Sequence, residues 1–384
     1  MFEAVCFSAG IRWRILTATL TVLGPGREFW HQAAEILPFE MILRCLFRLD
    51  GLFDPLLRQQ KVDRPVFIVA HPRSGTTFLH RLLTEAGDFV AFPARDIALP
   101  SPVARRLLGR LVEWRLRHTR LMFPKQVGHE VTLDSIEEEE LLFTHTDNTQ
   151  FLALLTPLAF SDWDFAPLVY GDEQSPAVQR RAIEFFRECL KRQIRRVGKS
   201  RVVAKLNYSI MRMRSLLAAF PDARVVYVVR SPLETIRSHL SLHRNMLNHQ
   251  WMLDDLPSNR VRRYFQRRYR YDVELYRYME DLIDQQVIPD SQLLVLPYER
   301  LRSAPSAAVR EIADFADLSL SAAAWERIRA QDGWQTAYQP PHRHHALEDF
   351  GLTAEKVVRD LEFVFDKYGF PKEVDVPKEQ VPVA

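Results

Sequence analysis

The segment with the clearest chemical potential spans residues 71–77 and reads His-Pro-Arg-Ser-Gly-Thr-Thr. It combines one fixed positive charge, Arg73, with the hydroxyl groups of Ser74, Thr76 and Thr77. Gly75 can adopt backbone conformations closed to other residues, and it lets a ligand approach the main chain closely. Forked cationic donors, hydroxyls and backbone N–H groups together suit a phosphate-like anion. The segment is therefore predicted to bind a phosphorylated nucleotide.

This segment lies between a predicted strand and a predicted helix. Residues 66–70 form a short apolar run, which is typical of a buried parallel strand. Residues 76–86 have helical apolar spacing, and Gly87 is a natural stop. A loop at a helix N-terminus presents unpaired N–H groups at the positive end of the helix dipole. The flanking elements favour an anion site over a simple Ser/Thr cap, although the Gly-Lys pair of a Walker A loop is absent from the sequence.

Further apolar runs predict three more strands, separated by amphipathic helices. The strands are expected at residues 202–204, 225–229 and 293–296, and helices at 177–197, 309–315 and 355–368. Such alternation predicts right-handed crossovers and a parallel sheet covered by helices on both faces, a three-layer αβα fold. Ligands in such sheets bind outside the carboxyl ends of the strands. Residues 71–77, 205–208 and 230–238 are therefore the expected binding segments.

The composition is that of an ordinary globular enzyme and gives no indication of a nucleic-acid-binding protein or of a disulfide-rich secreted one. Lys and Arg number 52 against 49 Asp and Glu, so the net charge of +3 demands no nucleic-acid partner. A hydrophobic content of 47% and a charged content of 26% are ordinary for a globular enzyme. The scattered Cys6, Cys45 and Cys189 form no CxxC pair, which suits a reducing compartment and a cytoplasmic location.

Residues 1–60 are expected to form an N-terminal helical extension, followed by a main domain at 61–370 and a tail at 371–384. The apolar run at residues 15–26 is too short to span a bilayer. Packing on the main domain is the favoured interpretation. The alternative is an in-plane membrane contact through apolar side chains of the extension: Trp13, Leu16, Leu20, Leu23, Phe29 and Trp30.

At this point the sequence resembles a known family. Residues 72–79, Pro-Arg-Ser-Gly-Thr-Thr-Phe-Leu, look like the 5′-phosphosulfate loop of the bacterial-type sulfotransferases, which use 3′-phosphoadenosine 5′-phosphosulfate (PAPS). The family's second signature is a strand-end arginine and a serine eight residues later, which hold the nucleotide 3′-phosphate. Arg230 and Ser238 match that spacing. The resemblance covers about residues 64–370 and implies a P-loop NTPase-like sulfotransferase fold, with PAPS as co-substrate and no metal.

The local pattern around the second signature is also that of a helix start. Ser231 is expected to cap the helix, with Pro232 at the first helical position and Glu234 completing a capping box. The resemblance then assigns seven residues to the nucleotide: Arg73, Ser74, Gly75, Thr76, Thr77, Arg230 and Ser238.

Sulfuryl transfer builds negative charge on the leaving oxygen, so a fixed cation there lowers the barrier. Arg73 is the candidate, together with Lys205 at the end of the second strand. The acceptor must also lose a proton to a histidine or carboxylate.

Residues 128–140 resemble a His…Pro-Glu-Glu segment of the family, with Ile136 in place of the proline. His129 and either Glu137 or Glu138 are the candidates for the base and its orienting partner. The alternative for the glutamates is structural, because Ser135 and Glu138 have the spacing of a capping box.

The acceptor is predicted only as a hydroxyl or amine of a small molecule or lipid. Its pocket is expected from residues 92–123, 151–170 and 239–256, and its walls from apolar and aromatic side chains there, namely Phe92, Phe151, Leu155, Phe160, Trp163, Phe165 and Trp251. The arginine-rich segment 260–270 is expected to be a helix with its arginines outward.

Two other functions remain open from the sequence. One is an ATP-dependent small-molecule kinase, which would need a magnesium-binding carboxylate at a second strand end. The other is a catalytically inactive nucleotide-binding protein. His342, His344 and His345 are given a role at the solvent or 3′-phosphate edge rather than in a metal site.

Overall fold

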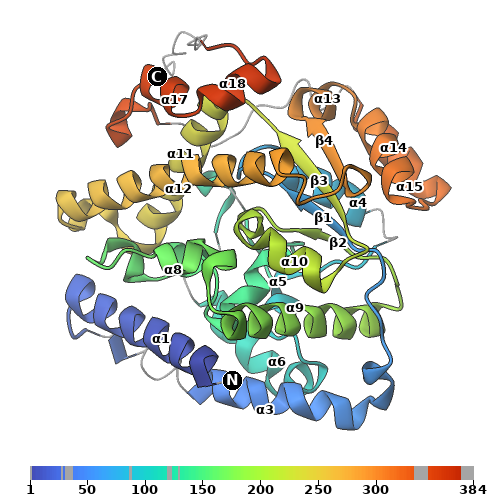
Figure 1. Cartoon of the computed structure of the whole chain (residues 1–384). Coiled ribbons are helices and arrows are strands. Elements are labelled where there is room, and N and C mark those ends of the chain that lie inside the picture. The colour runs from blue at the N-terminus through green and yellow to red at the C-terminus, as the bar shows by residue number, and fades with distance from the viewer. Residues whose placement is uncertain are drawn as a thin grey trace, which may run out of the picture.

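The computed structural model describes residues 2–26, 29–30, 38–85, 89–118, 123–128, 130–332 and 345–372. Its centre is a parallel sheet with strand order β2-β1-β3-β4 (Figure 1). The strands are β1 Val66–Val69, β2 Val203–Lys205, β3 Arg224–Val229 and β4 Leu293–Pro297. Val66 lies opposite Val203 on one side and Arg224 on the other, so β1 is fully hydrogen-bonded within the sheet. The four predicted strands and their parallel arrangement are confirmed.

Sixteen of the chain's helices carry labels that are used below. Before β2 come α1 Phe2–Leu23, α3 Pro38–Phe53, α4 Thr76–Thr84, α5 Ala94–Ala98, α6 Pro102–Arg117, α7 Phe151–Leu155, α8 Ala166–Val169 and α9 Pro176–Val197. After β2 come α10 Met213–Ala219, α11 Pro232–Trp251, α12 Ser258–Asp284, α13 Tyr298–Ser303, α14 Pro305–Ala316, α15 Ala322–Arg329, α17 Ala354–Asp360 and α18 Glu362–Tyr368. The single helix predicted for 355–368 is therefore two helices, because the backbone leaves helical geometry at Leu361, whose side chain is fully buried.

Alternate residues of β1 enter two different cores, which defines the three layers. Val66 and Ile68 pack with α4 and α14, whereas Phe67 and Val69 face the larger core built by α9, α10, α11 and α12. All four residues are completely buried, as expected for a strand covered on both faces. This arrangement leaves the carboxyl ends of the strands as the open edge of the sheet.

The N-terminal helices pack on the rest of the chain. Ile11 and Ile15 of α1 are buried in the larger core, and Arg12 pairs with Asp147 at 3.0 Å. Among the residues described, no helix combines the length and apolar character needed to cross a membrane. All three cysteines are free thiols, and Cys189 is buried.

Asp50 of α3 ties three helices together from a buried position. Its carboxylate accepts hydrogen bonds from the Ser101 hydroxyl at 2.8 Å and the Val103 amide at 3.0 Å, at the start of α6. The second carboxylate oxygen accepts from Arg192 Nε of α9 at 2.8 Å. The same contact fixes where α6 begins, because the Ser101 hydroxyl also accepts from the Ala104 amide and caps the helix.

Replacing Asp50 with alanine should be strongly destabilising. Asp50→Ala leaves the buried Arg192 without its buried counter-charge, so we expect the free energy of unfolding to fall by about 3 kcal/mol. Urea denaturation measures this loss. The control is Asp54→Ala, which removes a pair with Arg195 whose two side chains are each about one-third exposed, and it should cost less than about 1 kcal/mol. Equal losses in the two variants would contradict this account of Asp50.

Candidate active site

The loop between β1 and α4 has the backbone of an anion site. Arg73 has φ of 74° and Gly75 has φ of 81°, so both adopt left-handed conformations on either side of Ser74. Left-handed residues interspersed in a loop make concavities of successive N–H groups that bind anions. For Arg73 this conformation is strained, since only glycine adopts it freely.

Two contacts hold Arg73 in place and join the two predicted anion segments. Arg230 Nη1 donates to the carbonyl oxygen of Arg73 at 2.7 Å. The Arg73 side chain in turn donates from Nε to the Ser238 hydroxyl at 3.0 Å. The structure thus brings together Arg73, Arg230 and Ser238, which lie far apart in the sequence.

Tyr298, at the end of β4, closes the site from a third side. A Cβ atom placed on Gly75 would lie 2.8 Å from the Tyr298 ring, so only glycine fits there. The Arg230 guanidinium lies 4.1 Å from the centroid of the same ring, a cation–π contact. Sequence reasoning gave Tyr298 no role, although an aromatic residue directly after a fourth parallel strand was a usable signal.

The predicted capping box at the start of α11 does not form. Ser231 is the cap residue and Pro232 occupies the first turn, but the Ser231 side chain makes no capping hydrogen bond. Glu234 instead accepts from Arg230, with Nε and Nη2 both 2.7 Å from the same oxygen. An ion pair with an arginine one turn away competes successfully with a backbone cap.

Lys205 brings the second strand end to the same loop. Its ammonium group donates to the Thr77 hydroxyl at 2.7 Å and lies 3.4 Å from a carboxylate oxygen of Glu138. Asn207 adds a hydrogen bond from its side chain to the Thr76 hydroxyl at 3.2 Å. All three segments that the strand-end rule selected therefore meet at this edge of the sheet.

The four glutamates of segment 137–140 have different surroundings and different roles. Glu138 and Glu137 line the cavity described below, and Glu137 is almost fully buried, 3.6 Å from Arg81. Glu139 is structural, because it accepts from the Lys205 amide at 2.8 Å. Burial raises the pKa of Glu140 to about 7, against a hydrogen bond from Ser209.

The alternative capping role for Ser135 is wrong. Ser135 exchanges hydrogen bonds with Thr132 in a turn, and the 3₁₀ helix that follows begins only at Glu139. His129, the other candidate for the base, lies outside the described residues, as do His342 and His344. His345 is described, and its amide donates to the Ser241 hydroxyl of α11.

A cavity of about 2100 Å³ opens from the loop into the protein. Its polar end carries loop residues together with Lys205, Glu137, Glu138, Arg230 and Ser238. Its other walls are mainly apolar: Ile97, Leu111, Val112, Leu116, Phe123, Phe151, Leu154, Leu155, Leu242 and Met246. Of the predicted wall residues, Phe151 and Leu155 line the cavity, whereas Phe92, Phe160 and Phe165 are fully buried core residues.

Two histidines of α11 also line this cavity. Both lie in the segment 239–256 from which the sequence predicted part of the acceptor pocket, but neither histidine was given a chemical role. His239 directly follows Ser238, and His243 lies one turn further. The Nε2 atom of His239 lies 2.9 Å from the hydroxyl of Tyr208. A histidine next to the Ser238 position was a local signal for His239, but its partners lie in other segments.

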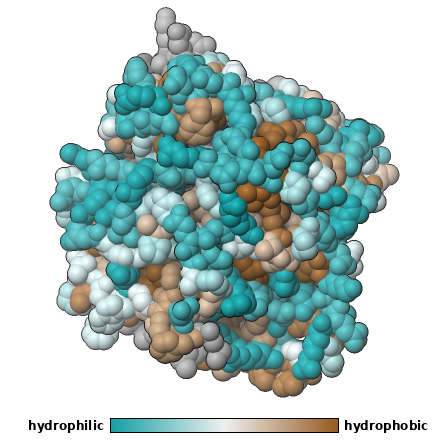
Figure 2. Space-filling model, in the orientation of Figure 1, coloured by the Kyte–Doolittle hydropathy of each residue, from teal (hydrophilic) through white to brown (hydrophobic). Residues whose placement is uncertain are grey.

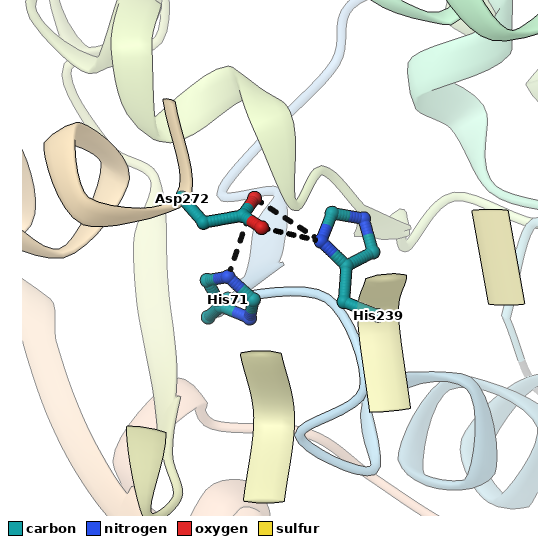
Figure 3. A group of neighbouring side chains, drawn as sticks. All are labelled: His71, His239 and Asp272. Carbon is teal, nitrogen blue, oxygen red and sulfur yellow. Dashed lines mark hydrogen bonds and ion pairs between the residues drawn. The ribbon is translucent and has the colours of Figure 1, made fainter. Parts of the chain in front are cut away.

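Asp272 of α12 anchors the His239 ring from behind (Figure 3). Its carboxylate lies 3.1 Å from His239 Nδ1 and 3.5 Å from His71 Nε2. Burial lowers the pKa of His239 to about 4 despite this carboxylate, so the ring is neutral near pH 7. Burial opposes ionisation of Asp272, but His239, Arg268 and hydrogen bonds hold its pKa well below the usual value.

His71, His239 and Asp272 have the side-chain types of a metal site, but their surroundings fit a hydrogen-bond network better. Arg268 Nε lies 3.2 Å from the same Asp272 oxygen and supplies the positive charge that a metal would bring. Arg268 is fully buried, so the prediction that arginines of this segment point outward is wrong at this position. Its charge is accommodated because Asp272 and Gln150 accept its hydrogen bonds.

Comparison with known proteins decides the family. The sequence model of the sulfotransferase family matches residues 65–322, a span that contains β1 to β4. The chain belongs to the sulfotransferase family. Both cationic strand ends, Lys205 and Arg230, lie inside the matched region.

Similar proteins come from mycobacteria. The omega-hydroxy-beta-dihydromenaquinone-9 sulfotransferases Stf3 of Mycobacterium bovis and Mycobacterium tuberculosis are each 23% identical over 369 residues, which cover 91% of this chain and 86% of theirs. Among solved structures, sulfotransferase STF9 of Mycobacterium avium aligns with a TM-score of 0.63 at 20% identity, covering 85% of this chain and 82% of that one. STF1 of Mycobacterium tuberculosis aligns with a TM-score of 0.63 at 19% identity, covering 92% and 90%. The structural likenesses establish the sulfotransferase fold.

Gly75 gives a direct test of the loop geometry. Gly75→Ala combines a left-handed backbone with a side-chain clash against Tyr298, so we expect a loss of stability well above the roughly 1 kcal/mol of a left-handed alanine alone. Gly198→Ala is the matched control, because Gly198 has φ of 69° and nothing within 4 Å of an added Cβ. Thermal unfolding of both variants measures the difference, and similar shifts would contradict the close approach of Tyr298.

Proposed function

We propose that the protein transfers a sulfuryl group from PAPS to a hydroxyl, or an amine, of a lipid-like acceptor. Membership of the sulfotransferase family supports the sulfuryl chemistry. The observation that carries the choice of donor is the direct link from Arg230 through Arg73 to Ser238. This link supports two anion-binding groups held at a fixed separation, as a nucleotide phosphorylated on both sides of its ribose requires.

The loop has free capacity for the 5′-phosphosulfate. The Ser74 hydroxyl is buried and has no hydrogen-bond partner among the described residues. In the proposal Arg73, Ser74, Gly75, Thr76 and Thr77 bind the 5′ group.

Arg230 and Ser238 bind the 3′-phosphate in the proposal. Two features of Arg230 suit this role: its side chain is about one-fifth exposed, and its carboxylate partner Glu234 is about half exposed. A phosphate can therefore replace Glu234 as the partner of Arg230, because the exposed Glu234 carboxylate loses little free energy when it returns to water. A kinase would instead require a magnesium-binding carboxylate at a strand end, whereas β2 ends in Lys205 and β3 is followed by Arg230.

The transfer step needs a cation and a base. As the acceptor oxygen forms a new bond to sulfur, the bond from sulfur to the bridging phosphate oxygen breaks, and Lys205 and Arg73 stabilise the charge that remains there. Glu138, 3.4 Å from Lys205 and facing the cavity, takes the proton of the acceptor. Glu137 orients this segment through its contact with Arg81, and His129 stays a candidate for the same proton-accepting role.

The cavity supports a large apolar acceptor. Its volume of about 2100 Å³ exceeds the roughly 300–1,000 Å³ of ordinary ligand pockets. Leucine, valine, isoleucine, methionine and phenylalanine side chains form most of the wall beyond the polar end. The mycobacterial relatives are named for a hydroxylated dihydromenaquinone. We therefore propose a long-chain lipid that presents its hydroxyl to Glu138.

The nucleotide assignment is tested by the 3′-phosphate. Isothermal titration should show that 3′-phosphoadenosine 5′-phosphate (PAP) binds more tightly than ADP, which lacks the 3′ group. Arg230→Ala should weaken PAP binding about 10- to 100-fold more than ADP binding, because both nucleotides lose the support that Arg230 gives the Arg73 loop, but only PAP also loses a charge-assisted contact to its 3′-phosphate.

The control is Arg244→Ala, an arginine of the same helix that does not line the cavity. It should leave the ratio of PAP to ADP affinity as in the wild type. The proposal fails if the unaltered protein binds PAP and ADP equally, or if Arg230→Ala leaves their ratio unchanged.

A further inference from the structure

Helix α6 forms part of the wall of the large cavity. Leu111, Val112, Arg115 and Leu116 of this helix all line it. The helix is anchored from below, because Val112 packs in a small core with Leu43 of α3 and Ala104. An acceptor that enters the cavity past this wall must therefore pass close to α6.

The outer face of α6 carries an unusual apolar stripe. Leu107 is 64% exposed, Leu111 61% and Trp114 58%, and all three lie on one helix face at the spacing i, i+4, i+7. Isolated exposed apolar residues are ordinary on protein surfaces. Three large exposed apolar side chains in one row are less ordinary than isolated ones. Leu111 also belongs to both this stripe and the cavity wall.

Basic side chains flank this stripe. The sequence of α6 contains five arginines and only one acidic residue, Glu113. Arg106, Arg110 and Arg117 are exposed, at positions next to the stripe residues. A helix with exposed leucine and tryptophan on one face and arginines beside them has the composition of a segment that lies in the plane of an anionic membrane surface.

We propose that α6 docks the protein onto an anionic lipid bilayer, with Leu107, Leu111 and Trp114 inserted among the headgroups. The entry of a lipid acceptor from the bilayer rests on the proposed function. The docking of α6 onto the bilayer does not. Leu111 makes the inserted surface continuous with the cavity wall, so a lipid can move from the bilayer to the site without crossing water. This placement differs from the in-plane contact through Trp13, Leu16, Leu20, Leu23, Phe29 and Trp30, which the sequence offered as an alternative.

A bilayer fits this surface better than a second copy of the chain. Two α6 helices packed face to face would oppose their arginines, which is unfavourable without matching acids. Anionic headgroups supply those charges at about 1 kcal/mol per basic residue. Helix α3, which packs against α6, also exposes apolar side chains: Leu52 is 69% exposed and Phe53 75%. Figure 2 shows hydrophobic residues along the lower edge, where Figure 1 places α3.

Vesicle flotation without nucleotide or acceptor tests the docking. The protein should bind vesicles of phosphatidylcholine with 30% phosphatidylserine, bind pure phosphatidylcholine weakly, and lose binding as salt rises. Two double variants, Leu107→Ser with Trp114→Ser and Arg106→Gln with Arg110→Gln, should each lower partitioning at least about tenfold. Neither pair lines the cavity, so transfer to a short water-soluble alcohol should be unchanged.

The control is Trp13→Ser, because Trp13 of α1 is 67% exposed and lies outside α6. It should bind vesicles as the unaltered protein does. The proposal is overturned if the unaltered protein does not float with anionic vesicles, or if both α6 double variants bind vesicles normally. It is also overturned if light scattering shows that the unaltered protein is a dimer and the variants become monomers with no change in vesicle binding. If the protein binds anionic vesicles but binds PAP and ADP equally, the docking of α6 stands and the proposed function fails.

Discussion

The hydrogen bond from Arg230 to the carbonyl of Arg73 is the interaction on which the site depends. The left-handed backbone of Arg73 costs on the order of 1–3 kcal/mol, and this contact opposes its relaxation. It also fastens the loop after β1 to the end of β3, while Thr77 fastens it to Lys205 at the end of β2. Tyr298, after β4, fills the remaining side. Four neighbouring strand ends therefore define one site, and every one of them supplies a side chain.

The sheet and the polar loops at its strand ends were predictable because their signals are local. A fully buried parallel strand such as residues 66–69 reads as an uninterrupted apolar run, and a hydroxyl-rich loop around a glycine follows it at once. The convergence of Arg73, Lys205 and Arg230 followed from the rule on strand ends. Both predicted capping boxes, at Ser135 and at Ser231, were wrong, because Thr132 engages Ser135 and Glu234 pairs with Arg230.

Other parts of the site have no local signal. The network of Tyr208, His239 and Asp272 joins three separate segments, and no spacing rule relates such residues. Apolar side chains in the predicted pocket segments could line the cavity or pack in the core, and the sequence does not distinguish the two. Phe151 faces the cavity, whereas Phe160 is buried in the core. Likewise, the arginines of α12 gave an amphipathic pattern, and only tertiary packing turns Arg268 inward onto Asp272.

The measurement that tests the central claim most directly is single-turnover transfer of radiolabelled sulfur from PAPS to a long-chain primary alcohol, with Lys205→Ala compared with the unaltered protein. The account predicts that label moves to the alcohol. Because Lys205 is proposed to stabilise the leaving oxygen, Lys205→Ala should slow transfer by about 100-fold or more, with PAP affinity changed only a few-fold. Label that never reaches the alcohol, or a rate unchanged in Lys205→Ala, would contradict it.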